Sequence, residues 1–168
     1  MIEQEFLRFS AEKLQQLGDR IEDCVSRLNQ DQIWTRNTQN ANSTGNLVLH
    51  LCGNVRQWIG FGIGDQADHR DRDSEFAARG GLEPRQIVDR LRATVSEAAG
   101  IIRHFDAARL MEKVTIQNYE VTKMEAIYHV VEHFSQHTGQ IMFVTKMLTG
   151  DDLGHFKHLN PGTAAHVP

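Results

Sequence analysis

The sequence predicts an all-α protein, an antiparallel four-helix bundle, and three observations favour this fold class. Apolar residues recur at three- and four-residue steps over four long segments, the spacing that gives a helix one apolar face. The 168 residues contain only three prolines, at positions 84, 161 and 168, so long stretches lack helix breakers. No strand is predicted in any segment. Long amphipathic helices joined by connections pack as bundles.

The first helix is expected from residue 2 to about residue 28. Residues 29–42 are polar and rich in Asn and Gln, which predicts a loop, with Ile33 and Trp34 as its anchors in the core. The apolar face of the helix consists of Ile2, Phe6, Phe9, Leu14, Leu17, Ile21, Val25 and Leu28.

A second helix is expected from Ser43, a favourable N-cap, to about Ile63. His50 lies at the margin of its apolar face, about 100° around the axis from Leu51. The glycines at 60, 62 and 64 should weaken and end this helix.

Residues 65–81 are dense in charge and predict a solvated loop with local ion pairs. A second interpretation is that Arg70, Arg72 and Glu75 line the mouth of a site, where the arginines would orient an anionic ligand. The sequence favours the solvated loop.

Two further helices follow. One begins near Pro84, which suits a first helical position, and runs to Phe105. Residues 106–121 are less periodic and indicate a connection with a short helical turn. The last helix begins with Thr122-Lys-Met-Glu125, a capping-box pattern, and ends near Leu148, with Gly150 as the left-handed residue after its end.

We expect one domain over residues 1–150 and a partly ordered tail over 151–168, which carries His155, His158 and His166. The net charge of −4 gives no electrostatic reason to expect nucleic acid as a partner. No apolar run is long enough to cross a membrane. An acidic amphipathic N-terminus unlike a signal peptide, and two cysteines expected to be reduced (Cys24 and Cys52), favour a cytoplasmic location.

Histidines recur every four residues on the last helix, at 129, 133 and 137. On a helical wheel His133 and His137 border the apolar face, whereas His129 points outward. Two histidines four apart on a helix make half of a metal site, and His50 is the best-placed third ligand on another helix. His104 and His69 suit this role less well. The alternative is that each histidine is satisfied by ordinary hydrogen bonds.

The chain resembles the DinB/YfiT-like superfamily of bacterial four-helix-bundle proteins. Two segments carry the resemblance: Leu49-His-Leu-Cys-Gly-Asn-Val-Arg-Gln-Trp58 and His129-Val-Val-Glu-His-Phe-Ser-Gln-His-Thr-Gly-Gln-Ile141. The resemblance implies a bundle of the DinB/YfiT-like type and a divalent metal, zinc or nickel, on His50, His133 and His137. It also implies open coordination positions and a homodimer.

Some relatives in that superfamily are metal-dependent thiol S-transferases that use bacillithiol or mycothiol. We therefore expect a metal-dependent thiol S-transferase or hydrolase acting on a small-molecule substrate, with Asn54 or Gln140 orienting a ligand or an imidazole. The sequence names no catalytic residue. The alternative is a non-catalytic protein, either a metal-binding protein or a dimeric interaction module of a stress response.

Overall fold

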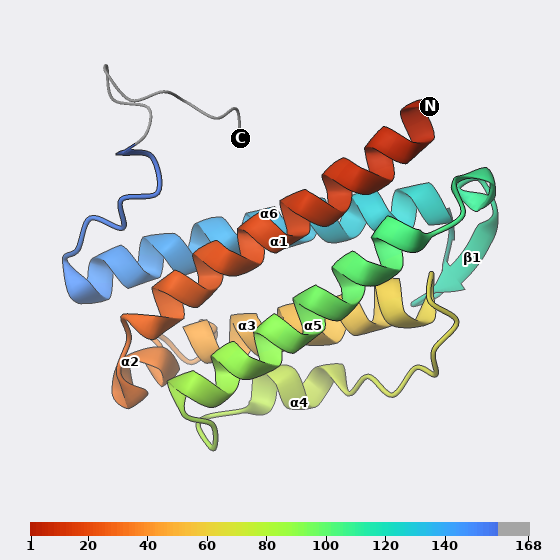
Figure 1. Ribbon diagram of the computed structural model, residues 1–168. Helices are drawn as coiled ribbons and strands as arrows, with labels where there is room; N and C mark the ends of the chain where they lie inside the picture. Colours follow the sequence, from red (N-terminus) through yellow and green to blue (C-terminus); the bar gives the residue numbers. More distant parts are fainter. Residues whose placement is uncertain (158–168) are drawn as a thin grey trace.

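The computed structural model describes residues 1–157, so His158 and His166 of the predicted tail lie outside the described residues. Four long helices form a bundle (Figure 1), which confirms the predicted all-α fold class. They are α1 (Ile2–Ser26), α3 (Thr44–Val55), α5 (Pro84–His104) and α6 (Lys123–Thr149). No helix among residues 1–157 combines the length and apolar character needed to cross a bilayer.

The four helices form a ring in which α1 and α3 each pack against both α5 and α6. Figure 1 shows that α3 and α5 run in the same direction, because the segment between them returns along the bundle. Consequently α1 is antiparallel to α5, and α3 is antiparallel to α6 (Figure 1). This last pair carries the histidines singled out in the sequence.

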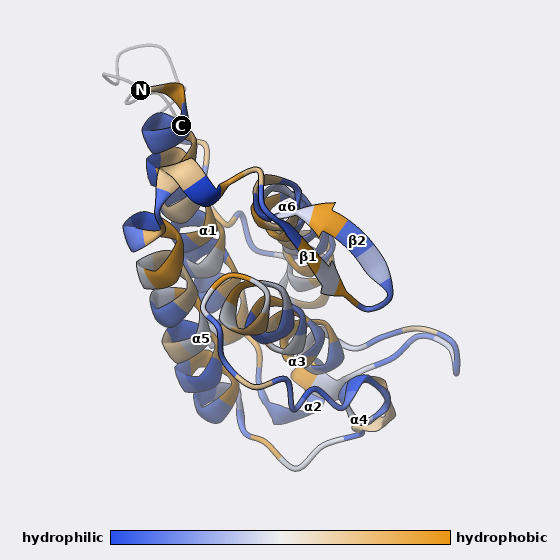
Figure 2. Ribbon diagram, turned by 90° about the vertical axis from the view of Figure 1, so that its right-hand side faces the viewer, coloured by the Kyte–Doolittle hydropathy of each residue, from blue (hydrophilic) through white to orange (hydrophobic). Residues whose placement is uncertain are grey.

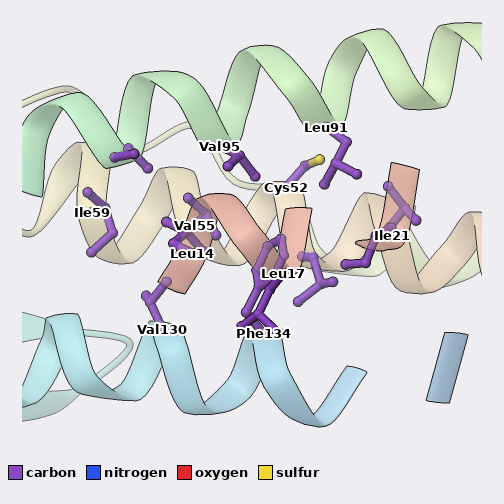
Figure 3. Packing of buried hydrophobic residues seen from close by; sticks show 14 of the residues in the cluster. Leu14, Leu17, Ile21, Cys52, Val55, Ile59, Leu91, Val95, Val130 and Phe134 are labelled. Carbon is purple, nitrogen blue, oxygen red and sulfur yellow. The ribbon is translucent and has the colours of Figure 1, made fainter. Parts of the chain in front are cut away.

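The core lies between the four helices and takes apolar side chains from each of them. Figure 3 shows the packing of Leu14 and Leu17, Val55, Val95 and Phe134, which come from α1, α3, α5 and α6 respectively. Burial of a core side chain of this size contributes roughly 1.5–3 kcal/mol. The two histidine-bearing helices, α3 and α6, therefore pack on one shared core.

The prediction of a loop over residues 29–42 is wrong at its start, where a short helix, α2 (Gln30–Trp34), forms. Asn29 caps it, since its side chain accepts from the Gln32 amide and the Gln32 side chain accepts from the Asn29 amide. Ile33 is fully buried, as expected, and Trp34 packs against the edge of the core.

The second helix begins where predicted, with Ser43 as its N-cap, but it changes geometry before it ends. Residues Arg56–Phe61 form a π-helix, η1, in which the Gly62 amide donates to the Gln57 carbonyl at 3.1 Å. A Cβ at Gly62 would lie 2.4 Å from the Ile116 side chain and 2.5 Å from the Trp58 carbonyl. Gly62 therefore allows this end of the helix to pack closely against the segment around Ile116.

That segment is a β-hairpin, which contradicts the expectation that the chain has no strand. Strands β1 (Lys113–Ile116) and β2 (Tyr119–Thr122) pair antiparallel, with Lys113 opposite Thr122 and Ile116 opposite Tyr119. Gln117 and Asn118 form the turn with φ values of 50° and 67°, the left-handed conformation that two-residue hairpin turns require. The predicted short helical turn precedes the hairpin as η2 (Ala107–Arg109). Figure 2 shows the hairpin beside the start of α6.

The ends of α6 are as predicted. Thr122 and Glu125 form the capping box, and Gly150 ends the helix with a φ of 74°. Cys24 and Cys52 are free, buried thiols. Burial raises the pKa of Cys52 to about 11, so this thiol is protonated at neutral pH.

Candidate metal centre

Three histidines from two helices meet on one side of the bundle. His50 comes from α3, and His133 and His137 come from α6. The Nε2 atom of His133 lies 3.2 Å from Nε2 of His50 and 3.1 Å from Nε2 of His137. One nitrogen of each residue lies within 4.8 Å of the others, so the cluster could hold a metal ion. The structure thus brings together the three residues predicted from the sequence.

The spacing of these nitrogens fits a tetrahedral ion. Zinc–nitrogen bonds of about 2.0–2.1 Å at the tetrahedral angle place two ligand nitrogens roughly 3.3 Å apart. His133 Nε2 carries either one proton or one lone pair, so without a cation it can make a good hydrogen bond to only one of its two neighbours at a time. The Nδ1 atom of His133 is buried and has no hydrogen-bond partner among the described residues. These observations show that the three residues fit a divalent cation.

The protonation of the α6 histidines also suits a cation. Burial, together with the nearby His137 and His50, lowers the pKa of His133 to about 3. Burial likewise lowers the pKa of His137 below its ordinary value. Both imidazoles are therefore neutral at pH 7, and a neutral imidazole is the form that binds a metal.

His137 has a partner that fixes its orientation. Its Nδ1 lies 2.7 Å from Oε1 of Gln140, one turn further along α6. Because the amide oxygen only accepts, Nδ1 carries the proton and Nε2 keeps the lone pair that faces His133. Gln140 thus orients an imidazole, one of the two roles considered for it in the sequence.

His50 contacts two charged residues from the segment predicted to be a solvated loop. Its Nδ1 lies 3.1 Å from Oε2 of Glu75, which also bonds Arg70, and the side chains of all three are at most 8% exposed. Glu75 lies in a short helix, α4 (Arg72–Ala77), capped by Asp71 and packed along α3. Burial raises the pKa of Glu75, but hydrogen bonds from Arg70 and His50 outweigh this and hold it below its usual value.

The solvated-loop prediction is therefore wrong for Arg70 and Glu75, although it describes the exposed Arg72, which stacks on Phe76. Sequence reasoning gave little weight to these residues. The signal in the sequence is Gly53, a glycine inside a helix, which indicates that another group packs closely there. A Cβ at this position would lie 1.8 Å from Oε1 of Glu75.

The other histidines of residues 1–157 lie outside the cluster. His129 is half-buried, and its ring stacks on Trp58 with centroids 4.1 Å apart. His104 is exposed, and its Nδ1 bonds the Gly100 carbonyl at 2.9 Å. His69 is exposed in the segment before α4.

A cleft of about 480 Å³ opens beside His50 and His133. Its volume is in the range of small-molecule sites. The cleft is bounded by α3, the hairpin and α6, and its lining includes Asn54, Trp58, Arg72, Tyr119 and His129. The Oδ1 atom of Asn54 and Nε1 of Trp58 are buried and have no partner among the described residues. The hairpin, which the sequence did not predict, thus forms one wall of this cleft.

The helical bundle and the three-histidine cluster together define a class of small helical proteins with a candidate divalent-metal centre. The chain belongs to the family described as proteins of unknown function DUF1572, whose model matches residues 1–159. This is a DinB/YfiT-like family, which confirms the resemblance drawn from the sequence.

Solved structures share the fold at low sequence identity. A conserved protein from Enterococcus faecalis is 16% identical, with a TM-score of 0.72, and the match covers 85% of this chain and 96% of that protein. A DinB-like protein, YjoA, from Bacillus subtilis is 12% identical, with a TM-score of 0.66, and the match covers 85% and 92%. A comparison with curated proteins gives no match.

Proposed function

We propose that His50, His133 and His137 hold a divalent cation through their Nε2 atoms, and that the protein is a metal-dependent enzyme acting on small molecules. The observation that carries this proposal is the convergence of three imidazole nitrogens from two helices, 3.1–3.2 Å apart. Zinc and nickel are the cations proposed, since imidazole suits both.

The donor set supports a catalytic role over a structural one. Structural zinc sites are usually closed by four protein ligands, whereas three histidines leave a position free for water or substrate. A cation bound by three neutral ligands supplies Lewis acidity, which activates water or a thiol near neutral pH. The cleft beside His50 and His133 gives a small substrate access to that position.

The reaction classes proposed are transfer of a low-molecular-weight thiol and hydrolysis. In either reaction, residues of this chain would bind and orient the substrate. Trp58, Tyr119 and His129 offer aromatic surfaces in the cleft, and Arg72 offers a positive charge at its edge. Gln140 and Glu75 would keep two of the ligand imidazoles in the required tautomer.

Metal analysis of protein purified without a nickel column tests the site. We expect about one equivalent of divalent metal in the wild type and a large loss in the double variant His133→Ala/His137→Ala. The matched control is His104→Ala, which removes an exposed histidine outside the cluster and should keep the metal. Equal metal content in the double variant and the wild type would refute the proposal.

A second assay addresses the reaction. The metal-loaded protein is incubated with bacillithiol, mycothiol or glutathione and a panel of electrophiles, and separately with a panel of ester and amide substrates. Turnover that disappears on chelation supports an enzyme. Metal binding without turnover in either panel would instead favour the non-catalytic metal-binding protein.

A cytoplasmic homodimer completes the proposal. The exposed apolar side chains Phe9 on α1 and Tyr128, Phe143 and Met147 on α6 offer surface for a second copy. Light scattering coupled to size-exclusion chromatography measures the mass directly, and a mass of one chain, 19.1 kDa, would contradict the dimer.

A further inference from the structure

We propose that Glu75 and Arg70 act as positioning residues for His50. These two residues form a buried ion pair beside α3, and this pair sets the geometry of the metal centre. The inference rests on the proposed metal site. It concerns residues that do not contact the ion and that lie 20 and 25 positions along the chain from His50.

The contacts around Nδ1 of His50 bear on which ring nitrogen carries the proton. Nδ1 lies 3.1 Å from Oε2 of Glu75 and 3.1 Å from Nη2 of Arg70, and Nη2 itself donates to Oε2 at 2.9 Å. The guanidinium only donates and would be satisfied by a lone pair on Nδ1, whereas the carboxylate only accepts and requires a proton there. Because Nη2 already donates to Oε2, and a lone pair on Nδ1 would face a full negative charge, the protonated Nδ1 is the favoured form. A proton on Nδ1 donates to that carboxylate instead, so the lone pair of His50 is on Nε2, 3.2 Å from His133.

Arg70 holds the carboxylate in place and balances its charge. Its Nε donates to Oε1 of Glu75 at 2.8 Å while Nη2 donates to Oε2, a bidentate pair. Its Nη1 donates to Gln57 at 3.0 Å, which ties the pair to the π-helix. Since the ion pair is neutral as a unit, it orients His50 without adding a net negative charge beside the cation.

The backbone around the pair is built to keep it against α3. Asn46 donates from Nδ2 to the carbonyls of Glu75 and Ala78, at 2.8 and 2.9 Å, and Arg36 donates to the Phe76 carbonyl at 2.8 Å. On α3, Gly53 leaves the space that Oε1 of Glu75 fills, since a Cβ would come within 1.8 Å. A buried ion pair usually gains little stability over apolar packing, which favours a positional role for this one.

The first test compares two charge-removing substitutions on α4. Glu75→Gln removes the charged acceptor of His50, whereas Asp73→Asn removes the same charge from an exposed residue of the same helix. Affinity for Co²⁺ is measured by competition with a chromophoric chelator, and the visible absorption of bound Co²⁺ reports its coordination. We expect Glu75→Gln to weaken binding by about 10–100-fold and to alter the spectrum, with Asp73→Asn within about threefold of the wild type. Equal affinities and spectra for the two variants would overturn the inference.

A second substitution keeps both charges, which covers the case in which Glu75→Gln fails to fold. Gly53→Ala should displace the Glu75 carboxylate and weaken Co²⁺ binding, whereas Gly100→Ala, where a Cβ meets nothing within 4 Å, should not. Unchanged Co²⁺ affinity in folded Gly53→Ala protein would also overturn the inference.

The tautomer of His50 can be read without any metal, from two-bond ¹⁵N–¹H correlations of the metal-free protein. We expect a proton on Nδ1 in the wild type and a mixture of tautomers in Gly53→Ala. A proton on Nε2 in the wild type would refute the positioning role. A wild type that binds no Co²⁺ yet carries the Nδ1 proton would refute the proposed function while upholding the orientation of His50.

Discussion

His133 is the residue on which the candidate site converges. Its Nε2 faces both other imidazoles, and its Nδ1 has no hydrogen-bond partner among residues 1–157. His50 and His137 each have an outer partner, a carboxylate and an amide respectively. The ligand set is therefore unequal: two imidazoles are oriented by hydrogen bonds from outside, whereas the third has the His129 ring stacked beside it, with centroids 5.5 Å apart.

Removal of the amide partner should weaken the site without removing a ligand. In Gln140→Leu, His137 loses the acceptor of its Nδ1 proton, so its ring can turn and change tautomer. We expect metal affinity to fall about tenfold, measured by chelator competition. Gln136→Leu is the matched control, since Gln136 is exposed on the same helix and bonds only Glu132 among the described residues. Equal affinities for the two variants would argue against a role for Gln140.

The three ligand candidates could be predicted from the sequence because helical periodicity fixes which positions face the core. That rule places His133 and His137 at the edge of the apolar face of α6 and His50 at that of α3. Arg70 and Glu75 could not be found in this way. Their contacts with His50 depend on how the segment before and within α4 folds back over α3, and no periodicity encodes that path.

At the scale of elements, the helix starts carry much of the predictable structure. Capping boxes begin α2, α3 and α6 at Asn29, Ser43 and Thr122. The caps of α3 and α6 were recognised from the sequence, and the same pattern at Asn29 would have identified α2. The hairpin was missed because its strands have four residues each and its turn is Gln-Asn instead of the more common Asn-Gly.

Loss of a cap should destabilise the bundle in proportion to the burial of the hydroxyl. Thr122→Ala removes the acceptor of the Glu125 amide at an exposed helix start and should cost about 1 kcal/mol. Ser43→Ala should cost more, up to about 2 kcal/mol, because Ser43 is 1% exposed and its hydrogen-bond partners would be left unpaired away from water. Urea unfolding measures both, and equal costs would contradict this ranking.

For the whole molecule, the arrangement of the chain places the site. The segment between α3 and α5 runs back along the bundle, which leaves α3 and α5 parallel and lays α4 beside α3 (Figure 1). A simple up-and-down bundle with a short loop at this point would have no α4 and no carboxylate next to His50. The same connection that sets the topology thus supplies the partners of one ligand.

Metal binding should stabilise the folded protein, because the ligands converge only in the native state. At a free zinc concentration of about 100 times Kd, the gain is about 2.7 kcal/mol, which raises Tm by several degrees. EDTA should reverse the shift, and His133→Ala/His137→Ala should show none. A rise in Tm of the same size in that double variant would place the bound metal elsewhere.

Anomalous scattering from a crystal of the metal-bound protein tests the central claim most directly. Data collected on both sides of the zinc or nickel absorption edge should show one peak about 2.0–2.2 Å from Nε2 of His50, His133 and His137, with an open position toward the cleft. An anomalous peak bound elsewhere on the chain, or no peak between these three histidines at saturating metal, would contradict the account.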